Sequence, residues 1–316
     1  MIGVGLSGGV DSAAATKELL DEGADVLGLF LRLHSDEGKE ARKRSQELGI
    51  PFQIVDARAA FQKSVVQPFI LEYAAGRTPN PCLYCNRNIK FGLLLDAAKK
   101  LGCKKLATGH YAKIENARIL RATDKKKDQS YAFALVKKEA LPFIVLPLGE
   151  KNKCEVKRAS NWRGGESQDL CFASSRLNAL KDLPKKRGRF VFNGKTVGEH
   201  YGAWFYCVGQ RHGLGRKRLY VKEVDAKENA VVLAERNELY CESFRVGEKN
   251  LHGPLPDEIN LIVRHHQQPV RCRVTGDTVT LLEPLWAPSP GQVAGFYDND
   301  LLVGGAIIKE VQWRVK

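Results

Sequence analysis

The sequence lacks any apolar run of the roughly 18 residues that a membrane-spanning helix needs. Its N-terminus starts directly with a strand-like apolar run. We therefore expect a cytoplasmic protein without a membrane partner. Acidic residues are also fewer than basic ones: the chain has 36 Asp and Glu and 50 Lys and Arg, which gives a formal net charge of +14. Neutralising phosphates releases counterions, so this excess favours RNA or DNA as the partner.

Cysteine is too sparse for a disulfide scaffold, with eight cysteines among 316 residues. In a reducing compartment such thiols are catalytic, metal-binding or simply buried. Tandem repeats and low-complexity tracts are absent as well. With 43% hydrophobic residues, a chain of this length can bury a sizeable core and is expected to form two or three domains.

Glycine-rich loops of the Walker type and of the dinucleotide-binding type are both missing, but residues 7–12 read Ser-Gly-Gly-Val-Asp-Ser. This turn follows a short apolar run and precedes a helical pattern. Adjacent glycines let a backbone approach a ligand closely, and the unpaired N–H groups of a first helical turn form an anion site. We expect a phosphate to bind there. The alternative is an ordinary strand-to-helix turn with Asp11 as the helix cap.

The first half of the chain alternates between strand-like and helical segments. Apolar runs predict buried strands at 25–31, 52–56 and 105–108. Periodic patterns predict helices at 38–48, 60–75 and 90–101. Two prolines within residues 76–86 predict a loop. The alternation indicates the α/β class with a doubly wound parallel sheet. Ligands of such sheets lie at the carboxyl ends of the strands, where Ser7 and residues 108–111 should meet.

The second half of the chain has a different pattern of predicted secondary structure. Residues 125–160 predict a helix-rich segment, and after residue 184 short β-type runs are separated by glycines and polar turns. These strands are expected at 189–192, 204–208, 219–224, 230–234, 259–264, 270–274, 278–282, 293–297 and 301–308. We therefore expect three domains, an α/β domain (1–180), a small central β domain (181–240) and a C-terminal β-barrel (241–316). Basic residues within 181–189 mark the first linker, and residues 237–245 mark the second.

Six motifs follow one another along the chain. Besides residues 7–12 they are Gly-Arg-Thr-Pro-Asn-Pro-Cys-x-x-Cys-Asn (76–86), Ala-Thr-Gly-His-Tyr (107–111), Lys-Asp-Gln-Ser-Tyr (127–131), Ser-Gln-Asp-Leu-Cys-Phe (167–172) and Gly-Gln-Arg-His-Gly-Leu-Gly (209–215). In this order they resemble the tRNA-specific 2-thiouridylase family, from residue 1 to about residue 310. The resemblance implies an N-terminal PP-loop ATP pyrophosphatase domain. It further implies an enzyme that adenylates the 2-oxygen of the wobble uridine in tRNA and replaces that oxygen with sulfur.

The resemblance also implies cofactors, partners and site residues. ATP with Mg²⁺ would be used, tRNA would be the substrate, and sulfide or a persulfide-carrying protein would donate the sulfur. ATP would be held by Gly5, Leu6, Ser7, Gly8, Gly9, Val10, Asp11, Ser12, Leu31 and Gly109. The flipped target base would lie against Asn80, Pro81 and Cys82. Other parts of the tRNA would contact His110, Lys127, Asp128, Gln129, Arg264, His265 and Gln292, although the family usually has Tyr at position 265.

Two cysteines would carry the sulfur chemistry. A thiol is a weak nucleophile unless it is ionised. Cys85 stands just before a predicted helix start, where a helix N-terminus would lower its pKa. By resemblance Cys85 is the nucleophile and Cys171 carries the transferable sulfur. Cys207 stands where the family tends to have Thr, and we interpret it, with Cys103, Cys154, Cys241 and Cys272, as structural.

Cys82 departs from the commonest family pattern, which has Asp at this position. With Cys85 it forms Cys-x-x-Cys, which alone is half a zinc site or a redox pair. With Cys171 added, the set suits a [4Fe-4S] cluster with one open iron, and the substitution favours this route. The other route uses a persulfide on Cys171 and a closing disulfide to Cys85.

Two rival functions stay open. One is another PP-loop ATP-dependent enzyme that modifies RNA or forms an amide. The other is a non-catalytic tRNA-binding relative. The presence of cysteines at positions 85 and 171, together with an intact loop, argues against both.

Overall fold

The structure is a computed structural model. It describes residues 1–159, 170–214, 217–264 and 267–314. No helix within these ranges is both long enough and apolar enough to cross a lipid bilayer.

The N-terminal domain is built on a parallel sheet of order β3-β2-β1-β4-β7. Its strands are β1 (Ile2–Gly5), β2 (Val26–Arg32), β3 (Phe52–Asp56), β4 (Lys105–Ala107) and β7 (Ile144–Val145). The chain moves outward in one direction from β1 to β3 and then returns to the other side of β1 with β4. The carboxyl ends of β1 and β4 therefore flank the switch point at which such sheets bind ligands. The expected α/β class is confirmed.

Helices cover both faces of this sheet. They include α1 (Val10–Asp21), α2 (Lys39–Glu47), α7 (Lys153–Ala159) and two long composite helices. The first composite helix runs through α3 (Arg58–Phe61), the π-helical η1 (Gln62–Val66) and α4 (Gln67–Ala74); the second runs through α5 (Pro81–Cys85), the π-helical η2 (Asn86–Leu94) and α6 (Leu95–Lys100).

The prediction of a loop over the whole of residues 76–86 is wrong at its end. Helix α5 begins at Pro81, because proline is tolerated in a first helical turn and the Asn80 side chain caps that turn by accepting from the Cys82 N–H at 3.1 Å. Cys85 therefore lies inside a continuous helix, not just before one. The remaining loop is fixed at both ends. A Cβ on Gly76 would lie 2.6 Å from the Val224 carbonyl oxygen, and the Thr78 N–H donates to the Pro290 carbonyl at 2.7 Å.

The segment expected to be helix-rich contains only short 3-10 helices before α7, namely η3 (Ser130–Phe133) and η4 (Lys138–Phe143). A hairpin that the sequence did not predict precedes them, made of β5 (Ala112–Glu115) and β6 (Arg118–Arg121). Strand β6 pairs with a strand of the C-terminal barrel, with Ile119 opposite Leu302. The N-terminal and C-terminal parts thus share one sheet.

The central domain follows α8 (Arg176–Ala179) and has a five-stranded sheet of order β10-β11-β12-β8-β9. Its strands are β8 (Gly188–Phe192), β9 (Lys195–His200), β10 (Arg211–Leu214), β11 (Lys217–Asp225) and β12 (Ala230–Ala234). The expected strand at 204–208 is absent. Its start forms the 3-10 helix η5 (Ala203–Phe205), because Trp204 packs into the fold as part of a tight turn after Gly202.

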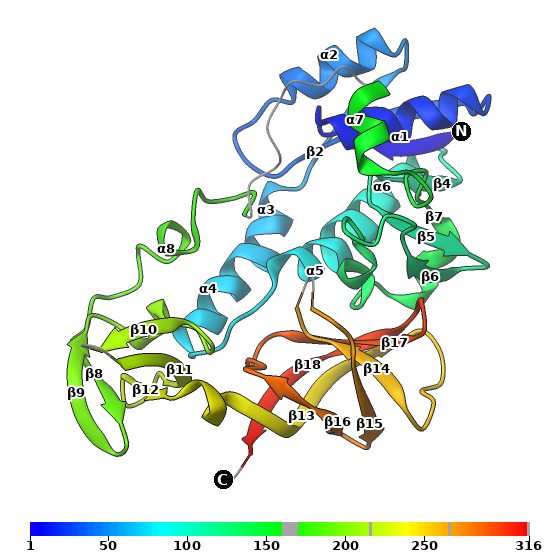
Figure 1. Cartoon of the computed structure of the whole chain (residues 1–316). Coiled ribbons are helices and arrows are strands. Elements are labelled where there is room, and N and C mark those ends of the chain that lie inside the picture. The colour runs from blue at the N-terminus through cyan, green and yellow to red at the C-terminus, as the bar shows by residue number, and fades with distance from the viewer. Residues whose placement is uncertain (160–169, 215–216, 265–266, 315–316) are drawn as a thin grey trace.

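Six strands close the C-terminal barrel, since β13 pairs with both β16 and β18. They are β13 (Tyr240–Leu251), β14 (Ile259–Ile262), β15 (Val270–Thr275), β16 (Thr278–Trp286), β17 (Val293–Asp298) and β18 (Leu301–Trp313). The expected linker at 237–245 is mostly strand, because β13 begins at Tyr240 directly after the 3-10 helix η6 (Arg236–Leu239). Figure 1 shows α4 descending from the N-terminal domain toward the central domain, with the barrel beside it.

Candidate active site

A cavity of 770 Å³ opens at the carboxyl ends of β1, β2 and β4. Of the residues predicted to hold ATP, those that line it are Gly5, Leu6, Ser7, Gly9, Val10, Asp11, Ser12, Leu31 and Gly109. Gly8 instead lies against Glu40 of α2. The structure thus brings the glycine-rich loop, the end of β2 and the turn after β4 to one place, as the doubly wound sheet predicts.

The loop at residues 7–12 is held by its own hydroxyl groups. The Ser7 N–H donates to Ser12 Oγ at 3.2 Å, and that hydroxyl donates to the Gly9 carbonyl at 3.0 Å. Gly9 is the N-cap of α1 and no side chain caps the helix, so the alternative with Asp11 as the cap is wrong. The N–H groups of the first turn are thereby left for an anion.

Asp11 is held from two directions. Lys153 Nζ contacts both carboxylate oxygens, at 2.6 Å from Oδ2, and the Tyr111 hydroxyl donates to Oδ1 at 2.9 Å. Burial and the neighbouring Asp11 charge raise the pKa of Tyr111, so the phenol stays a donor. Gly109 lies close by, and a Cβ there would be 2.7 Å from the Asp11 carbonyl carbon. Only glycine fits so near that backbone.

Lys153 is a cavity residue that the sequence did not predict. Its side chain comes from the start of α7 and is buried, with 8% of the residue exposed. In the sequence it stands in a charged run with Lys151 and Lys157, which is typical of a solvated helix face. The fold alone brings it to Asp11, where it places an ammonium beside the expected phosphate site.

Several residues predicted to contact tRNA line the same cavity or support it. His110, Lys127 and Gln129 are lining residues. Burial, with the charge of Lys90, holds the pKa of His110 well below its usual range, so the imidazole is neutral. His110 Nδ1 lies 2.8 Å from Thr108 Oγ1, and Lys90 Nζ lies 3.4 Å from its Nε2.

Asp128 and Gln129 have structural partners. The Tyr111 N–H donates to Gln129 Oε1 at 2.9 Å, and the Ala122 N–H donates to Asp128 Oδ1 at 2.9 Å. Both side chains therefore fix the turn that carries them against the β5–β6 hairpin.

The three cysteines of the predicted sulfur site come together. Cys82 and Cys171 are exposed and Cys85 is buried, and electrostatic interactions link all three thiols although Cys171 is far away in sequence. Burial raises the pKa of Cys85 to about 11, against an opposing effect of Lys90. The prediction that a helix N-terminus lowers this pKa is wrong, because Cys85 lies within the helix and its side chain is in the core. Burial raises the pKa of Cys171 as well.

The same thiols are the candidate ligands for a metal. Within the described ranges, no three His, Cys, Asp or Glu side chains are arranged to hold a metal ion. In this arrangement, Cys82, Cys85 and Cys171 do not fit an iron–sulfur cluster. Asp11, the acidic residue at the expected phosphate site, is engaged by Lys153.

The remaining predicted contacts lie on the barrel. The Arg264 guanidinium donates to the Ala287 carbonyl and lies 6.0 Å from the centre of the Trp286 ring. Gln292 Oε1 accepts from the Ser289 N–H at 3.2 Å, and Ser289 in turn donates to Thr78 Oγ1 at 3.0 Å. The turn with Gln292 therefore lies against the loop that carries Asn80 and Pro81. His265 lies outside the described residues.

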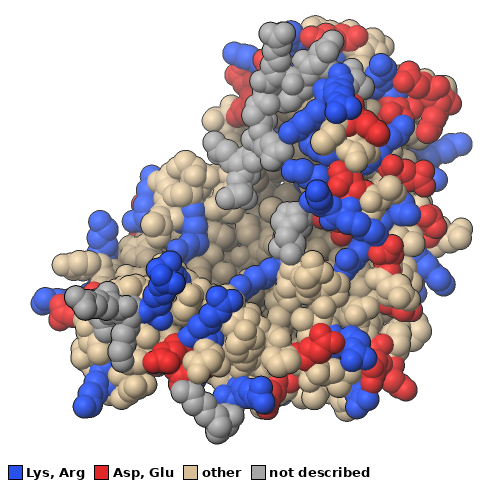
Figure 2. Space-filling view, viewed as in Figure 1, with Lys and Arg blue, Asp and Glu red and all other residues tan. Residues whose placement is uncertain are grey.

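Figure 2 shows a hollow in the middle of the molecule, between the N-terminal domain and the two β domains, with Lys and Arg side chains around its edge. Such a surface suits a large polyanion better than a small ligand.

Comparison with known proteins covers nearly the whole chain. Family models described as tRNA methyl transferase HUP domain, tRNA methyl transferase PRC-barrel domain and Aminomethyltransferase beta-barrel domain match residues 1–175, 179–235 and 241–308. The tRNA-specific 2-thiouridylase MnmA of Thermus thermophilus is 38% identical, over 97% of this chain and 94% of its own. The proteins of the same name from Treponema denticola and Aquifex aeolicus are 38% and 36% identical, over 98% of this chain in both cases and over 98% and 99% of their own.

The motifs, the three-part architecture and this full-length similarity agree, and the chain belongs to the tRNA-specific 2-thiouridylase family.

Proposed function

We propose that this protein uses ATP to thiolate the 2-position of the wobble uridine of tRNA. One observation carries the proposal for this chain in particular: Lys90 lines the cavity of the glycine-rich loop and also acts electrostatically on Cys85 and Cys171. A nucleotide site and a pair of thiols are therefore neighbours, as an adenylation followed by sulfur transfer requires.

The first step activates a poor leaving group. The 2-oxygen of uridine attacks the α-phosphorus of ATP, pyrophosphate leaves, and the base becomes an O-adenylate. Pyrophosphate would lie against the N–H groups of the loop at residues 7–12, with the Lys153 ammonium close by. Mg²⁺ would neutralise the phosphates when bound.

The second step moves the sulfur. A persulfide on Cys171, loaded by a donor protein or by sulfide in an oxidised form, attacks C2 with its terminal sulfur, and AMP leaves. The Cys85 thiolate then attacks the inner sulfur, so that the S–S bond breaks, its electron pair stays on the sulfur now bound to C2, and a Cys85–Cys171 disulfide forms. Two electrons from a thiol reductant reset the enzyme. Lys90 would stabilise the thiolate that burial disfavours.

The cluster route is the second candidate for this step, favoured by the Cys at position 82 in place of the common Asp. It requires Cys82 as a ligand, whereas the persulfide route does not. The electrostatic interaction between Cys85 and Cys171 supports the persulfide route, which joins these two residues.

The three parts of the chain would divide the work. Residues 1–180 would adenylate and thiolate the base in the cytoplasm, and residues 181–240 and 241–316 would bind the RNA. Asn80, Pro81 and Cys82 would surround the target base.

The decisive experiment is mass analysis of wobble uridines in unmodified tRNA after incubation with ATP, a persulfide source and the protein. We expect a mass gain from oxygen-to-sulfur exchange, with pyrophosphate released in equal amount. Cys171→Ala should still release pyrophosphate but leave the uridine unthiolated. Absence of both products would leave a tRNA-binding relative, and an ATP-dependent product without sulfur would indicate another PP-loop activity.

A further inference from the structure

A second concavity, of 540 Å³, lies at the junction of the central domain and the barrel, away from the cavity of the glycine-rich loop. It is lined by Arg218, Leu219, Glu235, Arg236, Asn237 and Tyr240, which come from β11, η6 and the start of β13. None of the motifs or predicted contacts falls on these residues.

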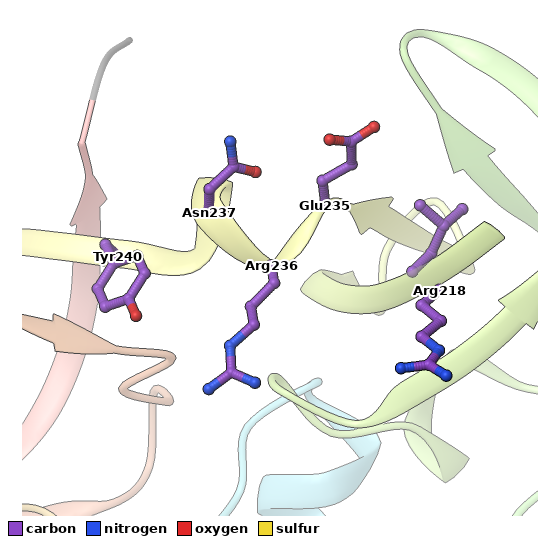
Figure 3. A pocket seen from close by; sticks show the side chains of 6 residues that line it. Arg218, Glu235, Arg236, Asn237 and Tyr240 are labelled. Atoms are coloured by element: carbon purple, nitrogen blue, oxygen red, sulfur yellow. The ribbon is translucent and has the colours of Figure 1, made fainter.

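The basic and acidic side chains of this concavity point in different directions. Figure 3 shows the guanidinium groups of Arg218 and Arg236 and the hydroxyl of Tyr240 pointing to one side, while the Glu235 carboxylate points to the other. The Glu235 side chain accepts from a backbone N–H in a capping box with Glu238. Within the described part of the chain, neither Arg218 nor Arg236 has an ion pair, and both are exposed. Among the lining side chains, the two guanidinium groups and the Tyr240 hydroxyl therefore share one side without a carboxylate.

The concavity is joined to a predicted tRNA contact. The guanidinium carbons of Arg236 and Arg264 lie 5.5 and 6.0 Å from the centre of the same Trp286 ring. Trp286 Nε1 also donates to the Arg236 carbonyl at 3.1 Å, and Tyr240 is its cross-strand partner. One tryptophan thus connects the concavity with Arg264.

The backbone at this junction is held by buried packing between the two β domains. Leu239, which ends η6, is fully buried in a core shared by Val208 and Ala234 of the central domain and Ala287 of the barrel. The Ala287 N–H donates to the Leu239 carbonyl at 2.7 Å. The backbone that carries Arg236 is therefore anchored to the barrel next to Trp286.

We infer that the concavity of Arg218, Arg236 and Tyr240 binds the sugar-phosphate backbone of tRNA, outside the segment that carries the target base. An arginine fork matches two oxygens of a phosphate, and a tyrosine hydroxyl supplies a further donor. The site reads no base sequence; it adds affinity and fixes the orientation of the RNA on the two β domains. The inference rests on the proposed function, because it requires tRNA as the substrate.

The test is the salt dependence of tRNA affinity, measured by filter binding between 50 and 200 mM salt for the full chain. Each phosphate contact contributes about one unit to the slope of log affinity against log salt. We expect Arg218→Gln/Arg236→Gln to lower the slope by about two, so that the wild-type chain loses about ten-fold more affinity over this range than the variant does. Arg218→Lys/Arg236→Lys should keep the slope but bind several-fold more weakly, since lysine lacks the fork.

A matched control separates the site from net charge. Arg271→Gln/Arg273→Gln removes the same two charges from β15, where both arginines pair with Glu258 and Arg271 also pairs with Glu283. We expect the wild-type slope from this control. A wild-type slope in Arg218→Gln/Arg236→Gln, or an equal change in the control, overturns the inference. Because Arg236 contacts Trp286, the single variant Arg218→Gln, with an expected slope change of about one, keeps the test valid if the double variant unfolds. Failure of the wild-type chain to bind tRNA would refute the proposed function instead.

Discussion

The burial of Cys85 predicts its reactivity quantitatively. The side chain is 7% exposed, and burial raises the pKa of its thiol from 9.0 to about 11. A shift of that size corresponds to about 3 kcal/mol against the thiolate. At pH 8 about one molecule in a thousand would carry the Cys85 thiolate, against about one in ten for a thiol with its ordinary pKa.

Replacing Lys90 perturbs this equilibrium in a known direction. The charge of Lys90 favours the thiolate, so Lys90→Met should raise the pKa of Cys85 further and slow its alkylation at pH 8, by roughly ten-fold. Lys90→Arg keeps the charge and should stay near the wild-type rate.

The assay is iodoacetamide labelling followed by mass spectrometry of the Cys85 peptide, from pH 7 to pH 10. Limited access lowers the rate at every pH, but only ionisation sets how the rate changes with pH. The logarithm of the wild-type Cys85 labelling rate should rise linearly with pH up to pH 10. Labelling of the exposed Cys154 in the same samples serves as an internal control for the reagent. A Cys85 rate that levels off near pH 9, or that is the same in Lys90→Met and Lys90→Arg, would refute the reasoning.

Three further variants test the site. Asp11→Ala leaves the buried Lys153 ammonium unpaired and should abolish pyrophosphate release while tRNA affinity stays nearly unchanged; parallel loss of tRNA binding would contradict this role. Gly109→Ala forces a Cβ against the Asp11 backbone and should lower the free energy of unfolding by about 1–3 kcal/mol in urea titrations, whereas no change would show that the turn has room. Cys82→Ala should keep thiolation with a persulfide donor; loss of activity together with loss of protein-bound iron would favour the cluster route instead.

The sequence predicted the segments whose signals are local. The apolar run at 25–31 became β2 because a strand buried on both faces of a parallel sheet must be continuously apolar, and the shorter run at 52–56 became the half-buried edge strand β3. The barrel strands from β14 onward followed from their short runs and turns. The motifs around Asp11 and Gly109 are far apart in the sequence, but they could be assigned to one ligand site because the carboxyl ends of neighbouring parallel strands meet at one edge of the sheet.

What the sequence did not predict depends on distant partners. Strand β6 is short and is stabilised by β18, which lies in the C-terminal barrel, so no local pattern marks it. Lys153 reaches Asp11 across 142 residues, and nothing in its charged neighbourhood distinguishes it. The environment of Cys85 also came out opposite to expectation, because Pro81, one of the two prolines that predicted a loop, instead begins a helix that carries the thiol into the core.

The pairing of β6 with β18 has a consequence for synthesis of the chain. Ribosomes release the N-terminus first, so the β5–β6 hairpin emerges about 180 residues before the strand that covers its edge. Until residue 301 is available, β6 exposes the unpaired N–H and C=O groups of an edge strand, which can pair with other chains. We expect a chain stopped at residue 240 to aggregate more readily than the full chain, as light scattering during refolding would measure. The last strand of the barrel thus also covers the exposed strand edge of the β5–β6 hairpin in the first domain.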